Sequence, residues 1–322
     1  MAWCPQCQEH YPNTLLVCPV HNVALESSHP DEPDPLVGLV LEGRYTIEAL
    51  IGEGAMGRVY RARQLKVDRL VAVKVLNAVA SRNTDTVSRF EAEARIISQL
   101  RHPNTLKLFD FGRTDDGQLF IVVELLKGLS LEDELAKGPI GPERTIRILG
   151  QALEALAEAH ELGVIHRDIK PANIMLEMVG GYEVAKVVDF GIAKVLSGTR
   201  HTATGRVVGT PAYMAPEQAM ASELTPQTDL YSMGIVAYEC LAGCLPFEGS
   251  SAHAIMLSHC KQTPPRFAEL PSAPPVPDVL ESFVLGLLAK APEHRPSSAQ
   301  LARGWLKEID RALGGYMDKS YD

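Results

Sequence analysis

The sequence has no apolar stretch long enough to cross a bilayer, which takes about 20 residues. Val276–Leu288 comes nearest, but Asp278, Glu281 and Gly286 interrupt it, as is typical of a core helix. The start of the chain also lacks the basic and apolar regions of a signal peptide. We therefore expect no membrane anchor in this chain, and a cytoplasmic location.

An excess of positive charge is also missing. The chain has 31 Lys and Arg against 40 Asp and Glu, a net charge of −9, and no basic run offsets this balance. Such a charge argues against general binding of nucleic acid. There is no internal repeat, and 322 residues with 46% hydrophobic content suffice for two lobes that share a cleft.

Chemistry-bearing residues gather in the middle of the chain. A run with the sequence HRDIKPAN begins at His166, and a DFG follows at Asp189. Asp168 can accept the proton of an attacking hydroxyl, and Lys170 can neutralise charge on a transferring phosphate. Asn173 and Asp189 supply the oxygen ligands that Mg²⁺ prefers. The order and spacing of the two strings indicate phosphoryl transfer.

These strings resemble those of the eukaryotic-like protein kinase family, in particular its bacterial serine/threonine members. The resemblance covers roughly Tyr45 to Leu313. It implies an α+β, two-lobed protein kinase fold, with a β-rich N-lobe and a helical C-lobe, that uses ATP with Mg²⁺ or Mn²⁺. The boundaries that we predict are an N-lobe at 45–123, a hinge at 124–128, a C-lobe at 129–313 and a tail at 314–322.

A glycine-rich segment lies near the start of this region and reads G-x-G-x-x-G-x-V from Gly52. Dinucleotide-binding folds use the same glycine spacing at a strand-to-helix turn. Here strand-like residues stand on both sides, which favours a β-hairpin whose glycines let the backbone approach phosphates. The predicted nucleotide contacts of this segment are Ile51, Gly52, Glu53, Gly54, Ala55, Met56, Gly57, Arg58 and Val59.

An alternating apolar run ends at Lys74 and predicts a buried strand. A lysine there is costly to bury unless it meets an anion. The resemblance implies that Lys74 holds the α- and β-phosphates and pairs with a glutamate of the next helix, predicted over Ser88–Leu100. Glu91 and Glu93 compete for this role, and alignment with the family favours Glu93.

The predicted hinge follows the strand Leu119–Val123, which ends at the position that the family calls the gatekeeper. The resemblance implies that backbone groups of Glu124 and Leu126 bond the adenine edge. From sequence alone, ordinary core packing explains the apolar residues expected around the ring equally well; these are Ile51, Val59, Ala72 and Met175.

The segment from Asp189 to Glu217 is bracketed by the motifs DFG and APE. In the resembling family, an arginine at the position of Arg167 pairs with phosphate on this segment and orders it. We therefore predict autophosphorylation at Thr202 and Thr204, for which a homodimer is one arrangement. The alternative is that both threonines are simply solvated.

The resemblance also assigns the acceptor. Lys170, two residues after Asp168, and the string GTPAYMAPE are the serine/threonine pattern, so protein substrates with Ser or Thr hydroxyls are expected. Asp229 is expected to brace the catalytic loop, and Glu217 and Arg295 to form a buried ion pair.

Two other functions compete with a protein kinase. One is a catalytically silent scaffold that binds nucleotide, but such proteins usually lack the lysine, the base or the metal-binding aspartate, and Lys74, Asp168 and Asp189 are all present. The other is a small-molecule kinase on a related fold, against which the complete GTPAYMAPE and DLYSMG strings weigh.

A second constellation stands at the start of the chain. Cys4, Cys7, Cys18 and His21 form a C-x₂-C and a C-x₂-H pair, and three thiolates with an imidazole suit tetrahedral Zn²⁺. So few residues cannot bury a core, which motivates a structural metal. The segment resembles the zinc ribbons that precede some bacterial kinases. His10 as the fourth ligand, a Cys4–Cys7 disulfide, idle thiols in a tail and an iron–sulfur cluster remain alternatives.

The chain as a whole therefore divides into two units joined by a linker. We predict a zinc ribbon at residues 1–25 and a kinase domain at 45–313. Residues 26–44 are acidic and rich in proline at their start, which is typical of an extended linker.

Overall fold

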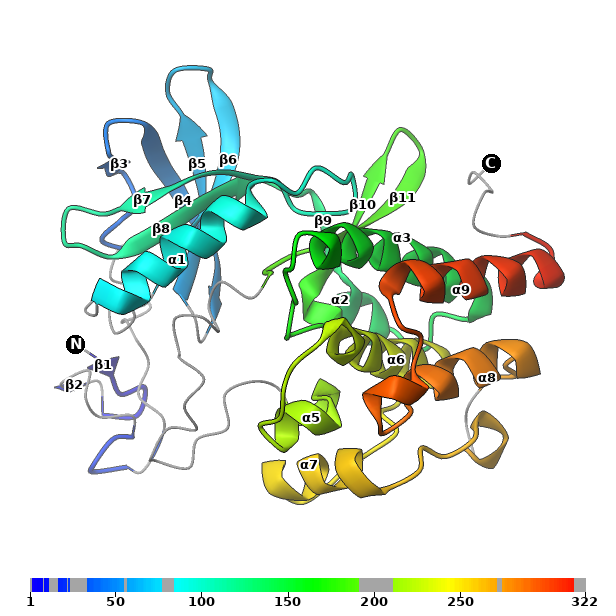
Figure 1. Ribbon diagram of the computed structural model, residues 1–322. Coiled ribbons are helices and arrows are strands. Elements are labelled where there is room, and N and C mark those ends of the chain that lie inside the picture. Colours follow the sequence, from blue (N-terminus) through cyan, green and yellow to red (C-terminus); the bar gives the residue numbers. More distant parts are fainter. Residues whose placement is uncertain are drawn as a thin grey trace.

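The computed structural model describes residues 2–7, 9–11, 17–21, 23, 34–54, 57–76, 84–190, 211–270 and 274–315. The side chains of residues 2, 3, 10, 84–89 and 93 lie outside this description. From residue 34 onward the chain forms a strand-rich lobe followed by a helical lobe, as predicted (Figure 1).

The amino-terminal lobe is a six-stranded antiparallel sheet with the order β3-β4-β5-β6-β8-β7. Its strands are β3 (Val40–Leu41), β4 (Tyr45–Gly54), β5 (Gly57–Gln64), β6 (Arg69–Leu76), β7 (Leu108–Arg113) and β8 (Leu119–Glu124). Strands β4 and β5 pair directly with each other, so the glycine-rich segment belongs to a β-hairpin. The prediction of a hairpin in place of a strand-to-helix turn is confirmed.

Both faces of this sheet are buried. Successive side chains of a strand point to opposite faces, so Ala72 and Leu76 of β6 join the main core while Val71 and Val73 join a second core around Tyr60. Helix α1 (Thr84–Ile97) lies across the face of the main core (Figure 1). Lys74 stands between Ala72 and Leu76 in this alternation. Its side chain therefore points to the same face of the sheet as theirs, toward the main core and the other lobe.

Helix α1 ends earlier than the predicted Ser88–Leu100. The amide groups of Gln99 and Leu100 bond the carbonyls of Ile96 and Ile97, three residues back. Such bonds tighten a final turn and satisfy carbonyls at a helix end. Leu100 is still buried, so its apolar character reflects core packing after the helix.

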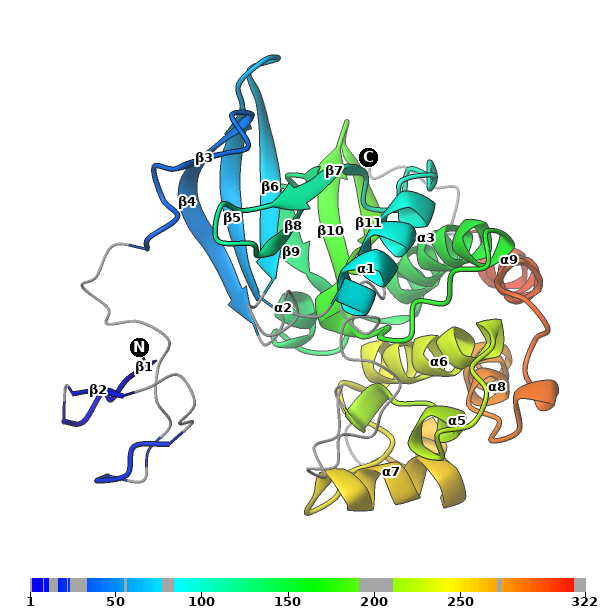
Figure 2. The same ribbon diagram turned by 60° about the vertical axis from the view of Figure 1, so that its left-hand side comes forward.

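A small antiparallel sheet with the order β11-β10-β9 lies where the lobes meet (Figures 1 and 2). Its strands are β9 (Gly128–Ser130), β10 (Ile174–Val179) and β11 (Tyr182–Val187). The remaining elements are α2 (Leu131–Leu135), α3 (Pro142–Glu161), η2 (Pro171–Asn173), η3 (Pro211–Tyr213), α5 (Pro216–Ala219), α6 (Pro226–Ala242), α7 (Ala252–Lys261), η4 (Phe267–Glu269), α8 (Asp278–Leu287), η5 (Pro292–His294) and α9 (Ala299–Leu313).

Helix α6 forms the centre of the carboxyl-terminal lobe, and it is buried on almost every side. It packs against α3 and α8, and α3 packs in turn against α9. Buried residues of α3 recur at helical spacing, for example Ile146, Leu149, Leu153 and Leu156. This rigid base carries the loop between α3 and η2 on which the predicted catalytic residues stand.

Before this domain, β1 (Ala2–Trp3) and β2 (His10–Tyr11) form a two-stranded antiparallel pair. The later part of the predicted linker, from Asp34 on, is attached to the amino-terminal lobe. Leu36 packs against the second core, and Val40 and Leu41 pair with β4. The predicted boundary at residue 45 stays a prediction.

Candidate active site and metal centre

The catalytic loop brings three predicted residues together. The Asp168 carboxylate lies 3.4 Å from Lys170 Nζ and 3.2 Å from Asn173 Nδ2. Asn173 Nδ2 also donates to the Asp168 carbonyl at 2.7 Å. The Asn173 amide is therefore turned so that its nitrogen faces Asp168 and its oxygen points away from that residue.

Asp229, at the start of α6, fixes the backbone of this loop. Its carboxylate accepts hydrogen bonds from the amides of His166 and Arg167, both at 2.8 Å, and lies 2.8 Å from His160 Nε2. Arg167 has a φ of 65°, in the left-handed region, and its carbonyl accepts from Gln218 Nε2 at 2.8 Å. These bonds have the geometry expected if Asp229 braces the backbone of the catalytic loop. His160 contacts the same carboxylate, and Gln218 bonds the backbone of the same loop.

Burial and hydrogen bonding set the protonation of this core. Burial alone would raise the pKa of Asp229, but the contact with His160 and the hydrogen bond from the His166 amide help to offset it, so the pKa is lowered. Burial lowers the pKa of His166. A neutral His166 fits its contacts, because Nε2 can donate to the Val188 carbonyl at 2.8 Å while Nδ1 accepts from the Asp168 amide.

Lys74 crosses the cleft between the lobes. Its Nζ lies 2.6 Å from the Asp189 carboxylate, and the Lys74 side chain is only 12% exposed. Asp189 has a φ of 60°, and the next residue, Phe190, is buried with its ring 4.8 Å from that of His166. In this structure Lys74 therefore pairs with Asp189, the predicted metal ligand. The side chain of Glu93, the predicted partner of Lys74, lies outside the described residues.

The glycine-rich hairpin lies next to Lys74. In the ladder of β5 with β6, Val59 stands opposite Lys74. Gly57 has a φ of 152°, and a Cβ there would lie 2.1 Å from the Val75 carbonyl oxygen, so no larger residue fits without a shift. Residues Ile51 to Gly54 are exposed, whereas Ala55 and Met56 lie outside the described residues.

The hinge is held by two side chains. Glu124 accepts from the Lys107 amide at 2.9 Å and from Lys186 Nζ at 2.8 Å. Glu177 accepts from the Lys127 amide at 2.9 Å. Beyond it, a Cβ on Gly128 would lie 2.0 Å from a backbone oxygen of β10, so the close pairing of β9 with β10 requires glycine.

Of the residues predicted to contact adenine, Ala72 and Val59 lie in the amino-terminal sheet, Leu126 in the hinge and Met175 on β10, whereas Ile51 is exposed. Ala72 is buried and stands opposite Val123 in the pairing of β6 with β8. Leu126 and Met175 are half-buried, and Met175 pairs with Ser130 at the junction of β10 and β9.

Cys4, Cys7, Cys18 and His21 converge on one point. Their ligand atoms all lie within 4.8 Å of one another. Cys7 Sγ is 3.8 Å from Cys18 Sγ, which in turn is 3.7 Å from His21 Nδ1. Two sulfurs bound to a tetrahedral Zn²⁺ at 2.3 Å would lie about 3.8 Å apart. All four residues are thus placed at the spacing of a metal site, and the three cysteines are free, without a disulfide.

In each knuckle, a backbone amide donates a hydrogen bond to the sulfur of the first cysteine. The Cys7 amide donates to Cys4 Sγ at 3.5 Å, and the His21 amide donates to Cys18 Sγ at 3.4 Å. Burial opposes ionisation of Cys18, but hydrogen bonds from the amides of His21 and Val20 and the contacts with Tyr11 and His21 lower its pKa to about 6. Contacts with Cys18 and Cys7 raise the pKa of His21. A thiolate at Cys18 suits a metal ligand.

Tyr11 is a member of this cluster that the sequence analysis missed. Its hydroxyl lies 3.5 Å from Cys7 Sγ and 3.7 Å from Cys18 Sγ. The contacts with both sulfurs raise the pKa of Tyr11, so the hydroxyl keeps its proton. The sequence carries no metal-ligand motif at Tyr11; the structure brings it near the sulfurs as part of β2, which follows the first knuckle.

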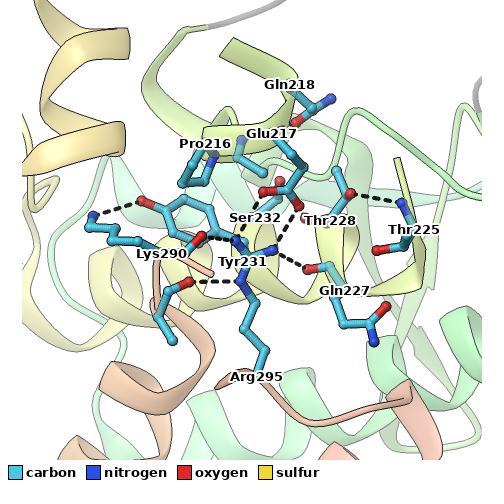
Figure 3. Close-up of polar contacts among 12 residues, drawn as sticks. Pro216, Glu217, Gln218, Thr225, Gln227, Thr228, Tyr231, Ser232, Lys290 and Arg295 are labelled. Carbon is cyan, nitrogen blue, oxygen red and sulfur yellow. Dashed lines mark hydrogen bonds and ion pairs between the residues drawn. The ribbon is translucent and has the colours of Figure 1, made fainter. Parts of the chain in front are cut away.

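The activation segment is only partly described. Thr202 and Thr204, the predicted phosphorylation sites, lie outside the described residues. Its end is anchored by the expected ion pair: Arg295 reaches Glu217 through two bonds of 2.7 and 3.0 Å and donates to the carbonyls of Ala289, Gln227 and Lys290 (Figure 3). Burial would raise the pKa of Glu217, but Arg295 lowers it.

A strand-rich and a helical lobe, joined by a short hinge and facing each other across Lys74 and Asp189, define a protein of the two-lobed kinase fold. Residues 45–306 match the family model described as "Protein kinase domain". The chain belongs to the protein kinase family.

Relatives and solved structures agree with this assignment. The chain is 41% identical over 286 residues to the serine/threonine-protein kinase pkn3 of Myxococcus xanthus, covering 87% of this chain and 52% of that protein. It is 40% identical over 270 residues to the serine/threonine-protein kinase PrkC of Bacillus subtilis, covering 82% of this chain and 40% of that one. This chain therefore spans about half or less of the length of these relatives.

Among solved structures, the kinase domain of PknI from Mycobacterium tuberculosis superimposes with a TM-score of 0.67 at 26% identity. The match covers 84% of this chain and 98% of that one. Of the helices in the part of the chain that the structure describes, none is both long and apolar enough to cross a membrane.

Proposed function

We propose that this chain is an ATP-dependent serine/threonine protein kinase. The observation that carries the proposal is the catalytic loop, in which the Asp168 carboxylate lies within reach of both Lys170 and Asn173. Asp168 would orient and deprotonate a Ser or Thr hydroxyl of a protein substrate, and Lys170 would steady the charge of the transferring group. The names of the relatives support the same hydroxyl class.

The nucleotide would bind in the cleft between the lobes. Lys74 would hold its α- and β-phosphates, the glycine-rich hairpin would cover them, and the backbone of Glu124 and Leu126 would meet the adenine. Lys74 already lies in the cleft, opposite Val59 of the hairpin and bonded to Asp189. Glu93 remains our proposed second partner of Lys74.

The residues fit a divalent metal. Asp189 and the amide oxygen of Asn173 are hard ligands of the kind that Mg²⁺ or Mn²⁺ takes. The Asn173 amide nitrogen is held by Asp168, so its oxygen is the free end for a ligand. When bound, the metal would neutralise phosphate charge; Lys74, Asp168 and Lys170 would position the reacting groups around it.

Activity would be controlled on the activation segment. We propose autophosphorylation of Thr202 and Thr204, with Arg167 as the residue that pairs with the phosphate, and a homodimer as the arrangement in which one chain modifies another. The backbone of Arg167 is bonded to both Asp229 and Gln218, so an ordered activation segment would act on a residue tied to the catalytic loop. The proposed location of this enzyme is the cytoplasm.

The cysteine-rich segment is proposed to be a structural zinc ribbon. Its support is the convergence of the ligand atoms of Cys4, Cys7, Cys18 and His21 within 4.8 Å of one another, with Cys7 and Cys18 at the sulfur–sulfur distance of a tetrahedral Zn²⁺ site. The free cysteines speak against the Cys4–Cys7 disulfide as the form present here.

Transfer to peptides tests the proposed function. The full chain, pretreated with phosphatase and then supplied with Mg-ATP, should phosphorylate peptides that carry Ser or Thr, and should leave a matched Tyr peptide unmodified. Asp168→Asn should lose about two to four orders of magnitude in rate, the range for a general base, while retaining Mg-ADP binding. Nucleotide binding without transfer by the wild type would favour the silent scaffold.

A further inference from the structure

The carboxylate of Asp34 anchors the segment that precedes the kinase domain. It accepts from the Leu36 amide at 2.9 Å, which closes a local turn, and from the Tyr60 hydroxyl at 3.0 and 3.2 Å. Tyr60 is fully buried on β5, and burial together with Asp34 raises its pKa to about 12, so the hydroxyl donates. The Asp34 side chain is only 12% exposed.

The same carboxylate reaches the glycine-rich hairpin through Arg58. One guanidinium nitrogen, Arg58 Nη1, lies 3.3 Å from Asp34 Oδ2. Another, Arg58 Nε, lies 3.1 Å from Glu53 Oε1. Arg58 and Glu53 stand directly opposite each other in the ladder of β5 with β4, next to the turn. A single arginine therefore ties Asp34 to both strands of the hairpin.

Arg58 borders an open pocket of the amino-terminal lobe. The pocket measures about 570 Å³, and both Arg58 and Glu53 line it together with Leu36, Leu39 and Asp116. The guanidinium therefore borders open space as well as packed side chains, and its contacts with the carboxylates of Asp34 and Glu53 help to hold it in place.

We propose that Asp34 is a positioning residue for nucleotide binding. Through Arg58 and Tyr60 it holds the glycine-rich hairpin in place before the nucleotide arrives, so that less ordering remains when the phosphates bind. This inference rests on the proposed function, because it assigns the hairpin to the nucleotide. It extends the nucleotide site to a residue outside the span that matches the kinase family model.

The chain contains a matched control for Asp34. Like Asp34, Asp110 accepts a hydrogen bond from the hydroxyl of a buried tyrosine, here Tyr45 at 2.7 Å. It also accepts from the Phe111 amide at 2.9 Å and forms an ion pair with Arg44. Tyr45 stands at the end of β4 that is far along the strand from the glycine-rich turn. Asp110→Asn thus removes the same chemistry from the same lobe, at the end of the hairpin that lies away from the glycine-rich turn.

The experiment compares Asp34→Asn and Asp110→Asn in the full chain. Without nucleotide, hydrogen exchange is followed at residues 51–54 and 57–60. With Mg-ATP and a Ser peptide, KM for ATP and kcat are measured, beside the Kd for Mg-ADP and the thermal midpoint. Asp34→Asn should speed exchange in the hairpin and raise KM and Kd by about tenfold, as for one lost charge-assisted contact. Its kcat should be unchanged, because the lost binding is common to ground and transition states.

The control separates positioning from stability. Asp110→Asn should lower the thermal midpoint as much, yet leave hairpin exchange and KM at wild-type values. Equal KM and equal hairpin exchange in the two variants would overturn the inference, since Asp34 would then be structural only. If Asp34→Asn does not fold, Tyr60→Phe, which keeps the core ring and loses the hydroxyl bond, is expected to give the same signature and decides in its place.

The two proposals fail differently. A wild type that binds no Mg-ADP and transfers no phosphate would remove the proposed function. The exchange measurement needs no nucleotide, so it would still show whether Asp34 holds the hairpin. A wild type that transfers phosphate, with a Asp34→Asn variant equal to it in KM, would leave the kinase function standing and remove the role of Asp34.

Discussion

At the scale of single residues, two strained backbone positions orient the predicted catalytic and metal-binding side chains. Arg167 and Asp189 both hold φ in the left-handed region, at 65° and 60°. Such positions cost about 1–3 kcal/mol each and persist only where the surroundings fix them. The carboxylate of Asp229 holds the Arg167 amide, and Lys74 bonds the carboxylate of Asp189. Contacts from both lobes thus set the direction of the predicted base and the predicted metal ligand.

The Glu217–Arg295 pair gives a prediction at this scale. Both side chains are buried, and Glu217→Gln leaves the Arg295 charge without its partner. Removing one partner of a buried pair typically costs about 3–5 kcal/mol. We expect unfolding by urea at pH 7 to show a loss of this size in the free energy of unfolding.

The pH dependence of this loss follows from the lowered pKa of Glu217. Because the folded-state pKa lies below the ordinary value of 4.5, the pair contributes its full stability above that value. The contribution is lost as the pH falls through the folded-state pKa. The gap between wild type and Glu217→Gln should therefore be constant from pH 7 to pH 5 and shrink below 4.5. A gap that stays the same at acid pH would contradict the account.

At the scale of elements, local patterns predicted the hairpin and the catalytic loop well. The glycine-rich segment has strand-like residues on both sides, and β4 and β5 pair around it. Asp168, Lys170 and Asn173 are close in sequence, so a short loop had to keep them close in space. Such features need no knowledge of the distant chain, which is why sequence reasoning found them.

The contacts that sequence reasoning missed join residues far apart in the chain. Asp34 looked like part of an acidic linker, but its partner is Tyr60, whose hydroxyl would be buried without it. His160 meets Asp229 across the packing of α3 against α6. Neither helical nor strand periodicity carries information on such pairs, since burial of a polar group creates the need for a partner only after the fold has formed.

At the scale of the whole molecule, the chain combines two kinds of stabilisation. The two-lobed domain has a large apolar core that includes both lobes. The cysteine-rich segment instead gathers Cys4, Cys7, Cys18 and His21 at one point. If this small unit is the proposed zinc ribbon, binding of metal would supply its free energy of folding.

Metal removal should therefore affect one unit alone. We expect purified protein to hold one Zn²⁺ per chain by elemental analysis. A chelator should abolish hydrogen-exchange protection in residues 2–23. The thermal midpoint of the kinase domain should stay unchanged. Cys4→Ser should lose the metal. Cys244→Ser, a half-buried cysteine after α6, should keep it. Iron in place of zinc would support the iron–sulfur alternative, and no metal in the wild type would remove the ribbon.

The central claim is phosphoryl transfer from ATP, and intact-mass spectrometry tests it most directly. The chain, dephosphorylated and then incubated with Mg-ATP, is compared with Asp189→Asn treated in the same way. Added phosphate is expected on the wild type and none on the variant, with fragment masses that place it on Thr202 and Thr204. Bound ATP without phosphate on the wild type or on a generic protein substrate would contradict the account.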